Sequence, residues 1–361
     1  MARYFAALVM LAAGCVGLVA GGPWTWTGVG VFIVAALCDA LARPDLGRRR
    51  IERGWRRQLA LYLPLLALVA LWALYARLLA QGSVTLPSLA GAMLSVAFLS
   101  ALGGLPPAHE LMHQAGRLPR LVASLYLTIF LLPMNDLGHV SGHHLRVATA
   151  DDYDTPRRGE KVYGFAFRSL WRQMLDSFAL ESARLAKLRL RWWMPGSRYL
   201  QASVTTLAWL GGWFALAGAS ALPVYVLTMV VFYLVLGGFN YTQHYGLIRV
   251  PGQPIEPRHA WNQLQPLSRS LSFEISNHSG HHLEPARPYT ELEPFPDAAR
   301  MPSIILCFVC AFVPPLWERL IARPRLASWD ASLASADERI LAREANRRAG
   351  WGTDGVLAVD E

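Results

Sequence analysis

The segment LPSLAGAMLSVAFLSALGGLPPAHELMH, residues 86–113, joins an apolar run to a pair of histidines. Its first part, 86–105, contains no charged residue and has the length of roughly 20 residues that a helix needs to cross a bilayer. HELMH (109–113) then matches the H-E-x-x-H pattern, in which two histidines one helical turn apart hold a metal ion. The segment therefore predicts a membrane helix that ends in metal ligands.

The rest of the chain shares this apolar character. Of its 361 residues, 53% are hydrophobic and 16% are charged, whereas soluble proteins carry about 25% charged residues. Apolar runs of spanning length recur, so the expected fold is an all-α integral membrane protein, a single domain over 1–361. The six spans are expected near 4–20, 24–41, 59–80, 86–105, 200–220 and 223–243.

Positive charge is concentrated in two segments between the expected spans. Residues 144–199 contain eleven Arg or Lys residues, and residues 42–58 contain seven arginines. These seven are Arg43, Arg48, Arg49, Arg50, Arg53, Arg56 and Arg57. Cytoplasmic loops carry such an excess, so both segments, both termini and a tail over 325–361 are expected in the cytoplasm, beneath a bacterial-type inner membrane. Topology thus accounts for the net charge of +9, and no nucleic acid partner is expected.

Two shorter apolar runs and one tail segment complete the expected organisation. The runs 121–133 and 302–322 are expected to form interfacial or re-entrant helices, because the first is short and the second contains Pro314 and Pro315. A helix over 336–349 is predicted by the capping-box spacing of Ser335 and Glu338 and by Gly350 at its end.

Nine of the ten histidines lie in four short boxes, each beyond the cytoplasmic end of an expected span or in a cytoplasmic loop. The boxes are HELMH (His109, His113), HVSGHH (His139, His143, His144), NYTQHYGL (His244) and HSGHH (His278, His281, His282). Residues four apart share a helix face, so His109/His113, His139/His143 and His278/His282 can each direct two imidazoles at one point. Because one metal usually takes about four such ligands, nine predict two metals, whose identity the imidazoles leave open.

Other classes of metal protein fit this histidine pattern less well. A zinc protease needs one metal and would leave about six histidines idle, and a transporter would place polar ligands near the middle of the bilayer. Glu110 is then a helix residue or a partner of an imidazole N–H. Asp151, Asp152 and Asp154, after the second box, are interpreted as loop and cap residues, with support of a ligand as the alternative.

The four boxes, in this order, resemble those of the integral-membrane di-iron alkane hydroxylase/xylene monooxygenase family, which is fatty acid desaturase-like. The likeness to the xylene-type hydroxylase component covers nearly the whole chain, through PPAHELMH, GFNYTQHYGLIR, MPSIILCFVCAFVPPLWERLI and AREANRRAGW. The resemblance implies two iron ions. Their implied ligands are His109, His113, His139, His143, His144, His244, His278, His281 and His282.

The resemblance also implies the reaction. It implies a monooxygenase that uses O2 to hydroxylate a methyl or alkyl C–H bond of a hydrocarbon resembling xylene or p-cymene. The alternative is an alkane or fatty-acid hydroxylase, desaturase or decarboxylase with the same site. Gln243 and Gly280 stand where alkane hydroxylases typically have Glu and Asp, which puts the substrate in doubt. His259, in HAWN, lies outside the boxes and is interpreted as a structural residue or a partner of a ligand.

Electrons for such a reaction must come from another protein. The chain shows neither a flavin-binding glycine fingerprint nor four cysteines at iron–sulfur spacing. Cys307 and Cys310 lie within an apolar run and are interpreted as packing residues. The expected partners are therefore a separate NAD(P)H-dependent reductase or ferredoxin-type donor, the lipid bilayer and a hydrophobic substrate.

Overall fold

The computed structural model describes residues 1–49 and 54–352, and in these ranges it consists of helices and loops without a β-strand. Arg50 and Arg53 of the expected basic segment, and residues 353–361 of the expected tail, lie outside the described residues.

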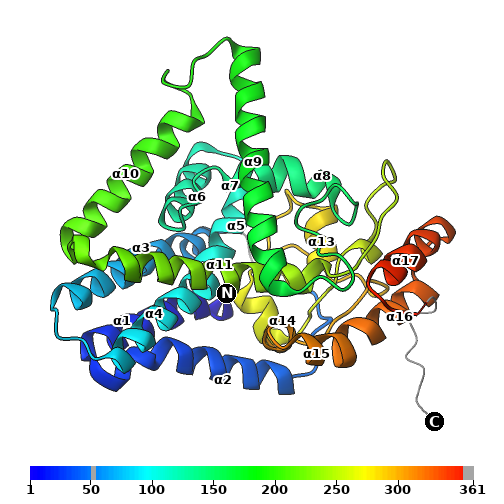
Figure 1. Ribbon diagram of the computed structural model, residues 1–361, viewed down its shortest axis with the longest axis horizontal. Helices are drawn as coiled ribbons and strands as arrows, with labels where there is room; N and C mark the ends of the chain where they lie inside the picture. Colours follow the sequence, from blue (N-terminus) through cyan, green and yellow to red (C-terminus); the bar gives the residue numbers. More distant parts are fainter. Residues whose placement is uncertain (50–53, 353–361) are drawn as a thin grey trace.

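Five helical segments are long and apolar enough to cross a membrane, which confirms an all-α, multi-pass membrane protein. The segments are Ala2–Ala20, Gly22–Leu41, Trp55–Ala80, Leu86–His113 and Ala219–His244. They contain α1 (Ala6–Ala20), α2 (Thr27–Leu41), α3 (Trp55–Ala80), α4 (Leu86–Leu99) with α5 (Leu105–His113), and α11 (Leu222–His244). In Figure 1 these helices run broadly alongside one another and form the lower part of the molecule.

The sixth expected span, 200–220, is helix α10 (Arg198–Ala217), which is not among the five segments. Its first half is diluted by polar residues such as Gln201, Ser203 and Thr206. Figure 1 shows α10 leaning away from the bundle at its start and meeting it at its end. There the indole of Trp213 donates a hydrogen bond to the Trp72 carbonyl of α3 at 3.0 Å.

Two adjacent glycines bring neighbouring helices close to α11. A Cβ atom at Gly237 would lie 2.4 Å from the Cβ of Ala166 on α9 (Val162–Leu188), and one at Gly238 would lie 2.7 Å from the ring of Phe308 on α14 (Ile304–Ala311). Small residues let helices approach closely in membrane proteins, and here they draw α9 and α14 onto α11 just before His244.

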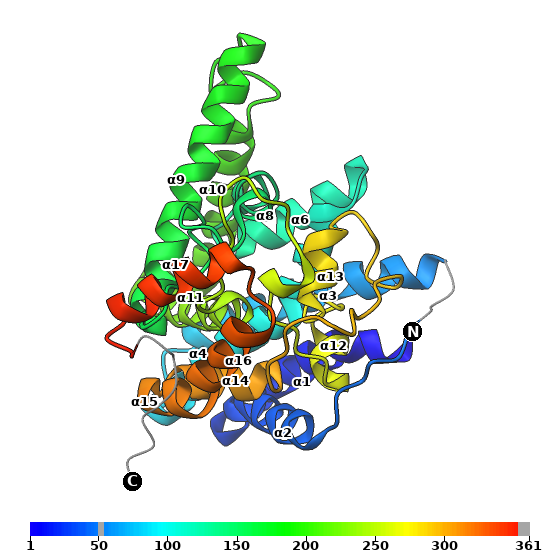
Figure 2. The ribbon, with the colours of Figure 1, turned by 90° about the vertical axis from the view of Figure 1, so that its right-hand side faces the viewer.

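Shorter helices complete the fold, and Figure 2 shows α13, α16 and α17 on the side of the molecule that faces the viewer. The shorter helices are α6 (Arg117–Ile129), α7 (Asn135–Gly138), α8 (His144–Arg146), α12 (Pro266–Leu271), α13 (His278–Leu283), α15 (Pro314–Trp317), α16 (Arg323–Ser332) and α17 (Ala336–Arg348). Wide π-helical turns occur at Ser100–Gly104, His139–His143 and Glu318–Ala322, and 3-10 turns at Ala2–Phe5, Gly22–Trp26, Ala219–Ala221 and Pro257–His259. The predicted tail helix is confirmed, with its capping box between Ser335 and Glu338 and a positive φ of 72° at Gly350.

Candidate metal centre

The nine box histidines converge at the end of the bundle in two adjacent groups. The first group is His109, His113, His139, His144 and His281, and the second is His143, His244, His278 and His282. Within each group, one nitrogen per imidazole lies within 4.8 Å of those of the other members. The four boxes, which are up to 173 positions apart between His109 and His282, thus meet in one place.

The second group has the spacing that a bound metal imposes. The Nε2 atom of His278 lies 2.7 Å from that of His244. The Nε2 atom of His282 lies 3.2 Å from that of His278 and 3.3 Å from that of His244. Two nitrogens that are each about 2.1 Å from a metal and at right angles stand about 3 Å apart. The Nδ1 atom of His278 donates to the carbonyl of Ile275 at 3.0 Å, which leaves its Nε2 lone pair facing the group.

The first group corrects one predicted pairing. His139 and His143 fall in different histidine groups, although their ligand nitrogens, with a carboxylate oxygen of Asp154, also lie within 4.8 Å of one another. The chain from His139 to His143 forms a π-helical turn, in which the amide of His144 bonds to the carbonyl five residues earlier. This turn brings His144 to the same face as His139, with their Nε2 atoms 3.1 Å apart. The Nε2 atom of His281 lies 3.1 Å from that of His144.

Burial favours the neutral, metal-binding form of most of these imidazoles. Burial, reinforced by neighbouring imidazoles, holds the pKa values of His139, His144, His281 and His282 well below the usual range, and burial with His143 lowers the pKa of His278 to about 3. Neutral imidazole is the metal-binding form. Within the described residues, the Nε2 atom of His113 is buried without a hydrogen-bond partner, and the Nε2 atoms of His144, His244 and His282 lie 2.7–3.3 Å from ring nitrogens of other box histidines. The donor set therefore fits a pair of metal ions.

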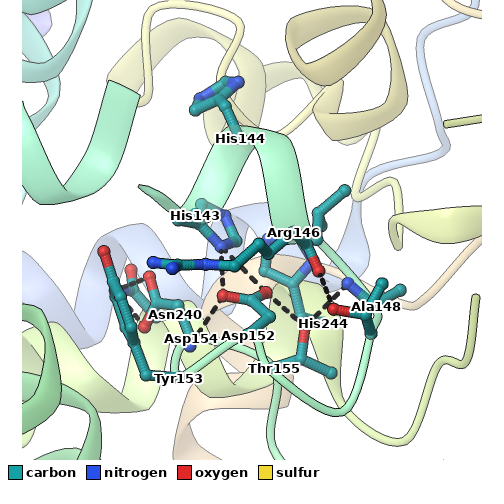
Figure 3. A network of polar contacts seen from close by, with 12 residues as sticks. His143, His144, Arg146, Ala148, Asp152, Tyr153, Asp154, Thr155, Asn240 and His244 are labelled. Atoms are coloured by element: carbon teal, nitrogen blue, oxygen red, sulfur yellow. Dashed lines mark hydrogen bonds and ion pairs between the residues drawn. The ribbon is translucent and has the colours of Figure 1, made fainter. Parts of the chain in front are cut away.

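His143 is held by a carboxylate that the sequence interpretation assigned to a loop or cap. Both carboxylate oxygens of Asp152 lie 3.0 Å from its Nδ1 atom (Figure 3), so Nδ1 carries the proton and Nε2 is free for a metal. Burial opposes a charge on His143, but Asp152 outweighs it and raises the pKa of His143. Asp152 also accepts from the Thr155 hydroxyl at 2.6 Å. The feature of the sequence that could have indicated this contact is the position of Asp152, within ten residues of a histidine box.

Asp154 lies beside both groups. Its carboxylate oxygen is within 4.8 Å of ring nitrogens of His139 and His143. It accepts hydrogen bonds from Ser169 of α9 at 2.6 Å and from Asn240 of α11 at 3.0 Å, contacts that Figure 3 shows in part. Asp154 thereby connects the second box to two helices, whereas Asp151 is exposed, as a loop residue would be.

Arg249 fastens the segment after His144 to the segment after His244. Its buried guanidinium donates to the carbonyls of Leu145 and Val147, both at 2.8 Å, and to that of Gln253 at 2.6 Å. Its own amide donates to the carbonyl of Ala148 at 2.7 Å. Sequence reasoning missed Arg249, because its partners are backbone carbonyl groups. Every residue has such a group, so nothing in the sequence marks the partners of this arginine.

Two further residues singled out in the sequence have structural contacts. The Glu110 carboxylate accepts from the Gln114 amide at 3.0 Å and from the Tyr289 backbone at 3.3 Å, and among the described residues it shares no hydrogen bond with an imidazole. His259 lies outside both groups, since its Nδ1 accepts from the Glu256 amide at 2.9 Å and its Nε2 donates to Glu338 at 2.8 Å.

A cavity of about 100 Å³ borders both histidine groups. His109 and His139 of the first group and His143, His244 and His278 of the second face it, together with Gln243 and Asp154. Apolar side chains from α5, α11, α12, α14 and the π-helical turn after α4 form most of the rest of its wall, and Asn135, Gln173, Asn240, Ser268 and Ser272 complete it. The apolar side chains include Ala101, Leu102, Leu105, Leu236, Phe239, Leu271, Ile304 and Ile305. A molecule in this cavity would contact hydrocarbon on one side and the histidine groups on the other.

Comparison with known proteins gives concordant results. Residues 83–300 match a family described as fatty acid desaturase. The chain is 36% identical over 353 residues to the hydroxylase component of xylene/toluene monooxygenase from Pseudomonas putida, which covers 97% of this chain and 95% of that protein. It is also 30% identical over 230 residues to alkane 1-monooxygenase from Ectopseudomonas oleovorans and 31% identical over 228 residues to alkane 1-monooxygenase 1 from Alcanivorax borkumensis. Each of these two matches covers 61% of this chain and 56% of the relative.

Proposed function

The chain belongs to the fatty acid desaturase family of proteins, and from this membership we propose that it is a membrane-bound di-iron monooxygenase that hydroxylates a methyl or alkyl group of a hydrocarbon. The observation that carries the proposal is the single cavity that borders both histidine groups and is otherwise mainly apolar. A C–H bond offers no polar group for recognition, so position in an apolar cavity must select it.

We propose an alkyl-aromatic substrate of the xylene or p-cymene type. The relative that matches over almost its full length is named for xylene and toluene, whereas the alkane enzymes match over 56% of theirs. The small cavity suits a compact molecule, and its wall includes Phe239, whose ring stacks on Phe308 with centroids 4.7 Å apart. An aromatic wall packs favourably against an aromatic substrate.

The two histidine groups are proposed to bind one iron each, with five ligands in the first and four in the second. When bound, the irons would supply the reduction of O2 by two electrons and two protons, with one oxygen atom inserted into the C–H bond and the other released as water.

The chain's own residues position the reactants. Asp152 orients His143, Arg249 holds two histidine boxes together, and the apolar wall places the alkyl group beside the ligands while excluding bulk water. The lipid bilayer supplies the substrate, and a separate NAD(P)H-dependent reductase or ferredoxin-type protein supplies electrons. The proposed location is a bacterial-type inner membrane, with the metal centre on the cytoplasmic side.

The test combines metal analysis with a substrate panel. Protein purified in lipid nanodiscs should contain about two irons per chain, and cells that also express a reductase should convert p-xylene and p-cymene to the methyl-hydroxylated alcohols. Octane and a fatty acid complete the panel. Consumption of these aliphatic compounds alone would overturn the aromatic assignment. One zinc per chain, with no oxygen consumption, would overturn the monooxygenase itself.

A further inference from the structure

A second apolar hollow lies beside the catalytic cavity. It has a volume of about 440 Å³ and lies between the turn after α6, helix α9 and the first half of α10. Its walls include Leu132, Met134, Met174, Phe178 and Ala202. The chemistry of these side chains suits a hydrocarbon rather than a polar metabolite.

The hollow and the catalytic cavity have one wall residue in common. Asn135, the first residue of α7, lines both. On α9 the two linings also adjoin, because Gln173 faces the catalytic cavity and the next residue, Met174, faces the hollow. The two spaces are therefore neighbours across the width of one side chain.

The hollow opens where the molecule presents apolar surface. Along the first half of α10, Val204 is 56% exposed, and Leu207, which lines the hollow, is 70% exposed. In Figure 1, α9 and α10 diverge from the main bundle, with α6 and α7 between them. The mouth of the hollow thus lies beside exposed apolar side chains of α10, a helix whose sequence is expected to cross the bilayer.

An ion pair beside the hollow connects two of the elements that form it. The Arg198 guanidinium at the start of α10 bonds both carboxylate oxygens of Asp136, at 2.8 and 2.9 Å, and the carbonyl of Pro133 at 3.3 Å. This fork-to-fork ion pair ties α10 to α7, which begins with Asn135.

We propose that this hollow is the lateral route by which hydrocarbon leaves the bilayer and reaches the catalytic cavity past Asn135. The inference rests on the proposed function and extends it from the reaction to the path of the substrate. A structural lipid chain held permanently in the hollow is the competing occupant.

The experiment compares two neighbouring positions on α10. Ser203 lines the hollow, whereas Val204 points outward and lines neither space. The iron-loaded variants Ser203→Cys and Val204→Cys are reconstituted in nanodiscs and labelled with a lipid-soluble aryl maleimide. The wild type is treated in the same way, to correct for labelling of its native cysteines. We expect labelled Ser203→Cys to lose at least tenfold in kcat/KM for p-xylene relative to its unlabelled form, with iron content unchanged. Labelled Val204→Cys should retain its activity.

A second readout does not depend on turnover. Saturating p-xylene should slow the labelling of Ser203→Cys severalfold and leave that of Val204→Cys unchanged. Equal activity of the two labelled variants, or labelling of Ser203→Cys that is indifferent to p-xylene but slowed by added phospholipid, would overturn the route. If the wild type oxidised no hydrocarbon, the proposed function would fail, while protection by p-xylene would still report whether the hollow binds hydrocarbon.

Discussion

The carboxylate of Asp152 holds the imidazole of His143 from behind, with both oxygens 3.0 Å from Nδ1. The contact is buried, and it is reinforced by the Thr155 hydroxyl and the Asp154 amide, at 2.6 and 3.0 Å. A carboxylate behind a histidine ligand fixes the proton on one nitrogen and makes the other a better metal ligand.

Replacing Asp152 with Asn should therefore weaken iron binding by about 10- to 100-fold, because the amide keeps the volume but loses the charge. Chelator competition on purified protein measures the change. Asp151→Asn, at the exposed position in the same loop, is the matched control and should bind iron like the wild type. Equal affinity in both variants would show that Asp152 does not support a ligand.

Removal of one proposed ligand should separate ligands from other histidines. His281→Ala should lower the iron content from about two per chain and abolish hydroxylation, since His281 lies within the first group. His259→Gln should keep both irons, because both ring nitrogens of His259 are bonded elsewhere. Iron per folded chain, with circular dichroism to confirm folding, decides the outcome, and full activity of His281→Ala would contradict the ligand assignment.

The aromatic wall should set the preferred substrate size. Phe239→Leu enlarges the cavity next to the histidines, so the ratio of kcat/KM for p-cymene to that for p-xylene should rise by about tenfold. Phe312→Leu is the control, because Phe312 also contacts Phe308 but does not line the cavity. An unchanged ratio in Phe239→Leu would show that the substrate does not contact this ring.

The clamp made by Arg249 should depend on its guanidinium. Lysine carries the same charge but cannot reach three carbonyls at once, so Arg249→Lys should destabilise the fold by about 1–3 kcal/mol through buried groups left unpaired. Thermal unfolding in nanodiscs measures the loss, and iron content should fall with it. Arg157→Lys, at an exposed position in the loop that follows the second histidine box, should change neither the thermal stability nor the iron content.

Acid should release the tail helix before it unfolds the membrane helices. Burial lowers the pKa of His259 from 6.5, so its contribution to stability is complete above that pH and declines as the pH falls below it. Despite burial, hydrogen bonds from Arg258 and others lower the pKa of Glu338 from 4.5, so its contribution is lost at still lower pH. The protection factors of the amides in α17, which are exchange rates corrected for their intrinsic pH dependence, should therefore decrease as the pH falls from 7 to 4. Protection that does not change over this range would contradict the assignment.

The sequence predicted the helices and the members of the site better than the way those members pair. Length and apolar character were enough to locate five spans, and box composition was enough to find all nine histidines. The division of His139 and His143 between two groups was missed, because an ordinary helical repeat was assumed where the chain forms a π-helical turn. For Asp152 the structure agrees with the alternative that the sequence left open, support of a ligand. Local sequence could not decide this, because a contact between a loop and a ligand depends on the path of the backbone.

Because His139–His143 forms a π-helical turn, the positions of its histidines depend more on the number of residues in the turn than on the identity of the residues between the histidines. Val140 and Ser141 lie between the flanking histidines and belong to neither histidine group, so exchanging their side chains leaves the imidazoles in place. Deleting one of them would rotate every later residue by about 100° about the axis, which would move His144 to the former position of His143 and His143 to that of Gly142. Among related sequences, a deletion at this point should therefore accompany loss of oxygenase activity, whereas substitution of the residues at positions 140 and 141 should not.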